Sequence, residues 1–167
     1  MVASEVAEAF SKLKKDRKVL HFGVSNFLPS QFDLLSSFLD FPLVTNQISF
    51  SLLDLTPLEN GTLDHCQKLK IQPMIWSPMS GGKIFRWESD QIHRIHRTII
   101  DIGNSLPNAS IDQIILAWLL KHPSNPIPLL GTGKLERLQN AVEATQLTLT
   151  REQWYQLLEA SVGSEVP

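Results

Sequence analysis

The stretch Pro126–Ala144, PIPLLGTGKLERLQNAVEA, contains the pattern that decides the fold of this 167-residue chain. Its apolar part, Ile127–Leu130, is short and ends at a glycine, which is typical of a buried strand. The residues after the glycines place Leu135, Leu138 and Val142 at helical spacing, which predicts one apolar face of a helix. The stretch therefore predicts a strand, a glycine turn and a helix in succession.

The turn between this strand and this helix, Gly131-Thr132-Gly133-Lys134, has the composition of an anion site. Glycines allow backbone N–H groups to approach an oxygen atom, and the start of a helix adds partial positive charge. Lys134 and Arg137 fall in the first turn of the predicted helix, where cations are unfavourable unless an anion lies nearby. The turn therefore predicts a phosphate-binding segment, although glycine turns are also common in ordinary strand–helix connections.

Length and composition predict a single domain over residues 1–167, located in the cytoplasm. The net charge of −2 gives no reason to expect nucleic acid or a membrane surface as a partner. The single cysteine, Cys66, excludes an internal disulfide and suits a reducing compartment. The longest apolar run, Ile114–Leu120, is far shorter than the roughly 18 residues of a membrane span, and Glu5 and Glu8 do not suit a secretory signal.

Periodicity along the chain predicts strands that alternate with helices. Four strands are predicted: Lys18–Val24, Leu43–Ile48, Ile71–Trp76 and Ile127–Leu130. The predicted helices are Ser4–Lys15, Gln31–Leu39, Gly61–Leu69, Ser89–Asn104, one from Ser110 to about His122, one after Gly133, and one capped by Thr150. Strands separated by helices imply right-handed crossovers and a parallel sheet, so we expect an α/β fold with extra helices before the fourth strand and at the end.

Each predicted strand ends in polar residues. They are Ser25-Asn26, Asn46-Gln47, Ser77 and Thr132. In parallel α/β folds the functional residues gather at the carboxyl ends of the strands, so we expect these side chains to form one site.

Motifs at these four ends resemble the aldo-keto reductases. They are Gly23–Phe27 (GVSNF), Thr45–Gln47 (TNQ), Trp76-Ser77-Pro78 with Gly81-Gly82, and Pro128–Lys134 (PLLGTGK) with Glu136-Arg137-Leu138. Their order suits strands five to eight of the family's (β/α)₈ TIM barrel, and within the family the chain is similar to predicted bacterial oxidoreductases of the YdhF type. The resemblance implies the C-terminal half of the barrel, with four parallel strand–helix units and additional helices.

The resemblance also implies a role for each matched residue. Ser25, Asn26 and Gln47 match positions that hydrogen-bond the nicotinamide carboxamide, and Trp76 matches the aromatic residue that stacks on the nicotinamide ring. The pyrophosphate-covering loop corresponds to Ser77, Pro78, Met79, Gly81, Gly82 and Lys83.

The last motif matches the segment that holds the adenosine part of the dinucleotide. Its residues Gly131, Thr132, Gly133, Lys134 and Arg137 imply NADP(H), because a guanidinium group suits a phosphate monoester. Where many members have an asparagine that contacts adenine, this chain has Ala141, so the neighbouring Asn140 is the residue expected to make that contact.

We assign no catalytic and no metal-binding residue to this chain. The resemblance implies that the family's Tyr, Asp, Lys and His belong to the other half, and Tyr155 lies outside every motif. His93 and His96 share a helix face but have no third ligand nearby. His21 suits a core position, and Cys66 is expected to be a quiet thiol.

Three functional hypotheses follow from the sequence. The first is the cofactor-binding half of an NADPH-dependent reductase of aldehydes or ketones, active only with its N-terminal half. The second is a non-catalytic NADP-binding or interaction module, and the third is an inactive fragment. A half barrel leaves two unpaired sheet edges and an uncovered inner face, so we expect a homodimer or a complementing half-barrel as partner.

Overall fold

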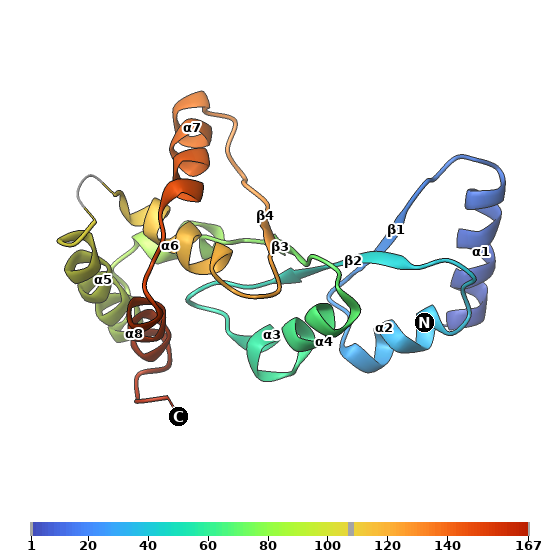
Figure 1. Cartoon of the computed structure of the whole chain (residues 1–167), viewed down its shortest axis with the longest axis horizontal. Coiled ribbons are helices and arrows are strands. Elements are labelled where there is room, and N and C mark those ends of the chain that lie inside the picture. The colour runs from blue at the N-terminus through green and yellow to red at the C-terminus, as the bar shows by residue number, and fades with distance from the viewer. Residues whose placement is uncertain (1, 107–108, 167) are drawn as a thin grey trace.

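The structure, a computed structural model, describes residues 2–106 and 109–166, and its centre is one parallel sheet (Figure 1). The strands pair in the order β1-β2-β3-β4, and the sequence-based prediction of four parallel strand–helix units with extra helices is confirmed. The strands are β1 (Phe22–Ser25), β2 (Leu43–Ser49), β3 (Met74–Trp76) and β4 (Ile127–Pro128).

The helices alternate with the strands as expected. They are α1 (Ala3–Lys15), α2 (Pro29–Ser36), α3 (Thr56–Glu59), α4 (Thr62–Leu69), α5 (Asp90–Gly103), α6 (Ile111–Leu120), α7 (Leu135–Glu143) and α8 (Arg151–Val162), with 3₁₀ helices η1 (Ser80–Phe85) and η2 (Ala144–Gln146). None of the helices within the described parts of the chain is long and apolar enough to cross a bilayer.

The prediction was wrong in the lengths of several elements. Residues 18–21 and 71–73 lie outside β1 and β3, and β4 ends at Pro128. Pro73 has no N–H to donate to a strand ladder, which is one reason why β3 begins late. A short helix, α3, occupies part of an expected loop with Pro57 near its start, and the expected loop after Trp76 contains η1.

The register of the sheet brings the ends of the strands together. Ser25 pairs with Gln47, Gln47 pairs with Met74, and Met74 pairs with Ile127, so these four residues form a row across all four strands. Because side chains alternate between the two faces of a sheet, this row shares one face. The neighbouring residue of β3, Ile75, is fully buried on the other face.

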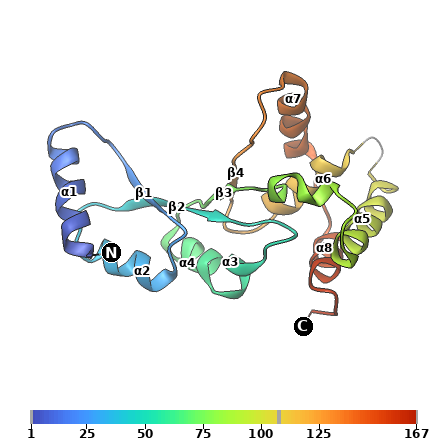
Figure 2. The same ribbon diagram turned by 180° about the vertical axis from the view of Figure 1, so that it is seen from behind.

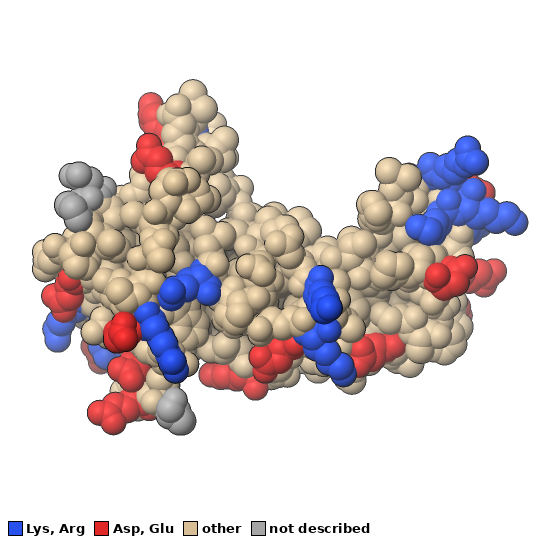
Figure 3. All heavy atoms as spheres, in the orientation of Figure 1, with Lys and Arg blue, Asp and Glu red and all other residues tan. Residues whose placement is uncertain are grey.

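Helices cover only one face of this sheet. Figure 2 shows α2, α3 and α4 on the same side of the strands. Figure 3 shows a hollow on the opposite side, between the parts of the molecule that Figure 1 labels α1 and α7. The edge of this hollow that faces the viewer in Figure 3 is largely uncharged. The face that carries Gln47 and Trp76 is therefore the open face of the sheet.

Two hydrophobic clusters meet at β2. Leu43, at the start of β2, belongs to a cluster with Phe22 and Phe32 beneath α1 and α2. Ile48, near the end of the same strand, belongs to a larger cluster that surrounds Trp118. Because both clusters contain residues of β2, this strand joins the two ends of the structure.

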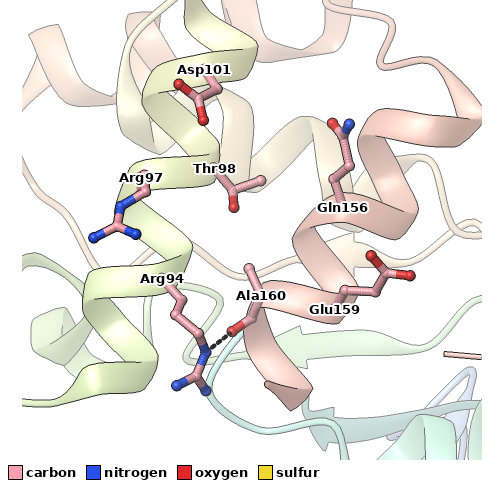
Figure 4. A pocket seen from close by; sticks show the side chains of 7 residues that line it. All are labelled: Arg94, Arg97, Thr98, Asp101, Gln156, Glu159 and Ala160. Atoms are coloured by element: carbon pink, nitrogen blue, oxygen red, sulfur yellow. Dashed lines mark hydrogen bonds between the residues drawn. The ribbon is translucent and has the colours of Figure 1, made fainter. Parts of the chain in front are cut away.

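Helices α5 and α8 lie side by side and are joined at the end of α8 (Figure 4). The Nε atom of Arg94 donates to the carbonyl oxygen of Ala160 at 3.1 Å, and Gln91 Nε2 donates to that of Ser161 at 2.9 Å. Carbonyl groups in the last turn of a helix have no partner within the helix, so these side chains of α5 satisfy the end of α8. The predicted capping residue Thr150 accepts a hydrogen bond at its start.

Helix α7 forms where the sequence predicted it, but the described residues leave its apolar face uncovered. The exposed fractions of Leu135, Leu138 and Val142 are 68%, 46% and 61%, and no residue of α7 is buried. The helix is held mainly through Ala141, which packs against the larger cluster, and through Asn140. Its apolar face is therefore available to another surface.

Replacing Gly23 by alanine is predicted to weaken the pairing of β1 with β2. A Cβ atom at Gly23 would lie 2.6 Å from Thr45 Cγ2 and 2.9 Å from the Thr45 carbonyl oxygen. Overpacking of this kind costs about 1–3 kcal/mol in the free energy of unfolding. Urea denaturation followed by circular dichroism measures the change.

The matched control is Gly103→Ala, because a Cβ atom at Gly103 would meet only Ile114 Cδ1 at 3.8 Å. This helical substitution is expected to leave stability unchanged or to raise it by up to about 1 kcal/mol. Equal stabilities of the two variants would contradict the close approach of Gly23 to β2.

Candidate functional site

The centre of the candidate site is a hydrogen bond that crosses β2. The Nε1 atom of Trp76, on β3, donates to Oδ1 of Asn26, which follows β1, at 3.0 Å. Beneath this bond, the carbonyl oxygen of Gln47 accepts from the Asn26 N–H at 2.8 Å and from Ser25 Oγ at 3.1 Å. The structure thus brings together the four residues that were predicted to contact the nicotinamide.

Asn26 is held in a conformation that few residues adopt. Its φ angle is +57°, in the left-handed region, where asparagine is enriched relative to most other non-glycine residues. The buried side chain of Asn46 fixes Phe27, the residue that follows Asn26. Its Nδ2 donates to the Phe27 carbonyl oxygen at 2.7 Å, and its Oδ1 accepts from the Phe27 N–H at 3.3 Å. Asn46 was recognised only as a polar strand end, and its positioning role is visible only in the structure.

The Trp76 ring lies on the open face of the sheet. Its exposed fraction is 37%, although its N–H group is occupied by Asn26. The hydrogen bond restrains the orientation of the indole while part of the ring surface stays accessible. A restrained and accessible aromatic ring suits the stacking of a planar group.

The loop that follows Trp76 has an unusual backbone. Ser77, Ser80, Gly81 and Gly82 have φ angles of 53°, 52°, 63° and 83°. Turns that combine right-handed and left-handed residues can direct successive N–H groups into a concavity that accepts an anion. Apart from their chain neighbours, no described residue has an atom within 4 Å of a Cβ placed at Gly81 or Gly82, so the backbone there is open to a ligand.

The side chains of this loop fix it to the body of the protein. Pro78 is buried and Met79 packs against the larger cluster, so both anchor the loop with their side chains. Ser80 Oγ lies 2.8 Å from Oγ of the buried Ser51, a contact that the sequence did not predict. Lys83 is exposed at the far end of the loop.

The glycines after β4 leave the sheet beside Trp76. The Leu129 N–H donates to the carbonyl oxygen of Ile75 at 2.8 Å, so the segment that begins at Gly131 starts next to the end of β3. Neither Gly131 nor Gly133 has a positive φ angle, and a Cβ atom placed on either would meet no atom within 4 Å. Nothing within the described residues therefore requires glycine there, which fits an external group that approaches the backbone.

Two cations follow these glycines at the start of α7. Lys134 lies at the N-cap position and not in the first turn as predicted, and its N–H donates to Thr132 Oγ1 at 3.2 Å. Arg137 lies in the first turn of the helix. Both side chains are exposed, and neither forms an ion pair with a described residue.

Asn140, which was predicted to contact the cofactor, also connects α7 to α6. Its Nδ2 atom donates to Asp112 Oδ2 at 2.6 Å and to Ser110 Oγ at 3.0 Å. Its main-chain carbonyl oxygen accepts from Gln113 Nε2 at 3.1 Å. These partners belong to α6 and its cap. The side chain therefore attaches α7 to α6, and its contact with the cofactor stays a prediction.

Other reactive side chains lie outside the site. Tyr155, on α8, packs edge-on against Trp154 with ring centroids 5.2 Å apart. Cys66 is buried, and desolvation raises the pKa of its thiol to about 11. Among the residues that the structure describes, no three His, Cys, Asp or Glu side chains are grouped so that they could hold a metal ion.

Comparison with known proteins identifies the family. The model of the aldo/keto reductase family matches residues 2–161, and the chain belongs to this family. It is 44% identical over 167 residues to oxidoreductase YdhF of Escherichia coli, and 41% identical over 162 residues to the uncharacterised oxidoreductase YcsN of Bacillus subtilis. It is 38% identical over 164 residues to a 6-dehydroglucose reductase of Agrobacterium fabrum.

These relatives are longer than the chain. The alignments include 97–100% of this chain but only 54–55% of each of the three proteins, so the chain spans about half of their length. The crystal structure of the thermostable aldo-keto reductase Tm1743 shows the same proportions, with 96% of this chain and 55% of the other covered at a TM-score of 0.84 and 27% identity. The metagenomic aldo-keto reductase MGS-M4 gives a TM-score of 0.70 at 25% identity.

Replacing Asn46 by alanine is predicted to release the turn that holds Asn26. The change leaves the N–H and carbonyl groups of Phe27 without their partner and costs about 1–3 kcal/mol in the free energy of unfolding. Urea denaturation gives the loss, and the tryptophan emission spectrum reports the altered setting of Trp76.

Asn104→Ala is the control, because Asn104 is exposed at the end of α5. An exposed substitution of this kind changes stability by no more than about 0.5 kcal/mol. If both variants lost the same stability and kept the native emission spectrum, Asn46 would have no positioning role.

Proposed function

We propose that this chain holds NADP(H) for an oxidoreductase that reduces an aldehyde or a ketone. The observation that carries the proposal is the Trp76–Asn26 hydrogen bond, which sets an accessible indole at the strand ends. The open backbones of Gly81-Gly82 and Gly131–Gly133 begin from the two neighbouring strands. Family membership and relatives named reductases support the type of reaction.

The residues fit the parts of the dinucleotide in order along the strand ends. Trp76 stacks on the nicotinamide ring, and Ser25, Asn26 and Gln47 orient its carboxamide. The loop from Ser77 to Lys83 covers the pyrophosphate with backbone N–H groups. When bound, NADPH supplies the hydride for the reduction of a carbonyl group.

Lys134 and Arg137 select the phosphorylated form of the cofactor in this proposal. Both are exposed cations without an ion-pair partner among the described residues, and both follow the open glycines. A guanidinium group can form two parallel hydrogen bonds to a phosphate, and the ammonium group of lysine adds a point charge. NADP(H) is therefore favoured over NAD(H).

The proton that accompanies the hydride requires a different part of the enzyme. A general acid must lie within hydrogen-bond reach of the carbonyl oxygen, and the one tyrosine of this chain packs on α8 against Trp154. We propose that the acid and most of the substrate pocket belong to a complementing half, consistent with relatives about twice as long. By itself the chain binds the cofactor without turnover.

An interaction module that binds NADP(H) without catalysis is the second candidate. The observation that favours it is the uncovered apolar face of α7 beside the open face of the sheet. Both candidates bind the cofactor. Only the first gives carbonyl reduction when a tyrosine-bearing N-terminal half is added.

Titration with NADPH is predicted to quench tryptophan fluorescence, and Trp76→Phe is predicted to remove most of the quenching. Arg137→Gln is expected to weaken NADPH binding about tenfold, which corresponds to about 1.4 kcal/mol, and to leave NADH binding unchanged. Isothermal titration calorimetry measures both affinities.

Arg97→Gln, which removes an exposed cation on α5, is the matched control and is expected to bind NADPH as the wild type does. An equal loss of NADPH and NADH affinity in Arg137→Gln would refute the proposed phosphate contact. A folded sample without affinity for NADPH would refute the cofactor proposal.

We also propose that the chain self-associates when no complementing half is present, because the apolar face of α7 and two parallel sheet edges lie open. Light scattering after gel filtration is expected to give a mass above that of one chain. The double change Leu138→Glu and Val142→Glu is expected to give the single-chain mass without loss of stability, since both side chains are already exposed.

Val162→Glu introduces the same charge at an exposed position of α8 and is expected to leave the association unchanged. A wild-type mass equal to one chain, together with a cooperative thermal transition, would rule out self-association.

A further inference from the structure

A cavity lies away from the strand ends that form the candidate site. It has a volume of about 490 Å³ and lies between α4, the start of α8 and the segment that follows α6. That segment, which contains Lys121 and His122, leads into β4, whereas the glycines of the cofactor site follow β4. The two sites are therefore at opposite ends of the same strand.

His122 lines this cavity and carries a hydrogen-bond donor. The residue is 5% exposed, and its Nδ1 atom accepts from the Ser124 N–H at 3.2 Å. Because Nδ1 is the acceptor, the neutral ring carries its proton on Nε2. Burial lowers the pKa of His122, while the charge of Asp64 acts in the opposite direction, so the neutral ring is the form present at pH 7.

The Nε2–H group of His122 has no partner in the part of the chain that the structure describes. Among the described residues, Nδ1 of His96 is the one fully buried side-chain nitrogen or oxygen without a hydrogen-bond partner. Because Nε2 of His122 also has no partner, it cannot be fully buried, and solvent reaches it. Because solvent reaches this N–H group, a ligand acceptor in the cavity can replace the water that bonds it.

The charges around the cavity favour an anion. Lys121 and Arg151 line it together with one acid, Asp64, and with the neutral His122. Asp64 already accepts from Gln67 Nε2 at 3.4 Å. The lining residues therefore carry two positive charges and one negative charge, and the exposed Glu152 lies outside the lining but near both cations. The pair of cations suits a ligand that carries a single negative charge.

One wall of the cavity is aromatic, and hydrogen bonds restrain it. Trp154 Nε1 donates to the carbonyl oxygen of Trp118 at 3.0 Å, and Trp118 Nε1 donates back to that of Trp154 at 3.1 Å. Tyr155 lies beside this ring, and the Arg151 guanidinium lies over Tyr155 at 5.7 Å from its centroid. Restrained aromatic rings next to polar donors are typical of sites for small planar ligands.

We propose that this cavity binds a small aromatic carboxylate. Nε2–H of His122 and the cations Lys121 and Arg151 hold the carboxylate, and Trp154 and Tyr155 contact the ring. The site is separate from the proposed cofactor site, so the two can be occupied together.

Benzoate is the probe, and benzamide is its neutral counterpart of the same shape. In NMR titrations of the whole chain, benzoate is expected to shift the ring signals of His122 and the indole signal of Trp154 to saturation, and benzamide is not. The same benzoate titration in the presence of saturating NADPH is expected to give the same affinity.

Lys121→Gln and Arg151→Gln are each expected to weaken benzoate binding about tenfold, because each removes a charge-assisted contact. Lys12→Gln, on α1, is the control for loss of one charge and is expected to bind benzoate normally. The three side chains are exposed in the wild type, so each variant is expected to fold, and dispersed amide signals check this.

Equal shifts by benzoate and benzamide would overturn the proposal, because the charge would then play no part. Unsaturable shifts, or unchanged affinity in both Lys121→Gln and Arg151→Gln, would overturn it as well. Loss of benzoate binding on addition of NADPH would show that the probe occupies the cofactor site instead.

Discussion

The parallel register of β1, β2 and β3 is the constraint on which the candidate site depends. It places Ser25 beside Gln47 and lets the indole of Trp76 reach Asn26 across the strand between them. The left-handed backbone of Asn26 is needed for this geometry, and the buried Asn46 holds the turn in place. A slip of one residue would move the row to the face that the helices cover.

The two faces of the sheet differ in how they are covered. Ile48 and Ile75 are buried beneath helices, whereas the opposite face carries Gln47 and Trp76 and stays open. Parallel sheets are normally covered on both faces, and α7 has an apolar face that no described residue contacts closely enough to bury. The proposed complementing half, or a second copy of the chain, resolves both features at once.

The two ends of β4 have different chemistry. After the strand come the glycines and exposed cations of the proposed cofactor site. Before the strand, His122 and a rigid tryptophan line a cavity with one free donor. A short strand thus separates two proposed sites that can be tested independently.

The sequence by itself determined the order of the elements, the parallel sheet and the family. Apolar spacing, capping residues such as Thr150, and glycine turns are local features, and local features are readable along the chain. Lengths of strands were less predictable, because pairing partners decide where a ladder begins and ends. The grouping of Ser25, Asn26 and Gln47 was predicted from their position at strand ends, and that of Trp76 from the resemblance to the aldo-keto reductases.

Only the tertiary structure decided what each side chain contacts. Asn140 turned toward Asp112 because α6 packs beside α7, and no local pattern encodes that neighbour. The free Nε2–H of His122 likewise follows from its bond to Ser124 and from the position of α8. Contacts between segments distant in sequence depend on how the elements pack, whereas the elements themselves depend on residues close together in the chain.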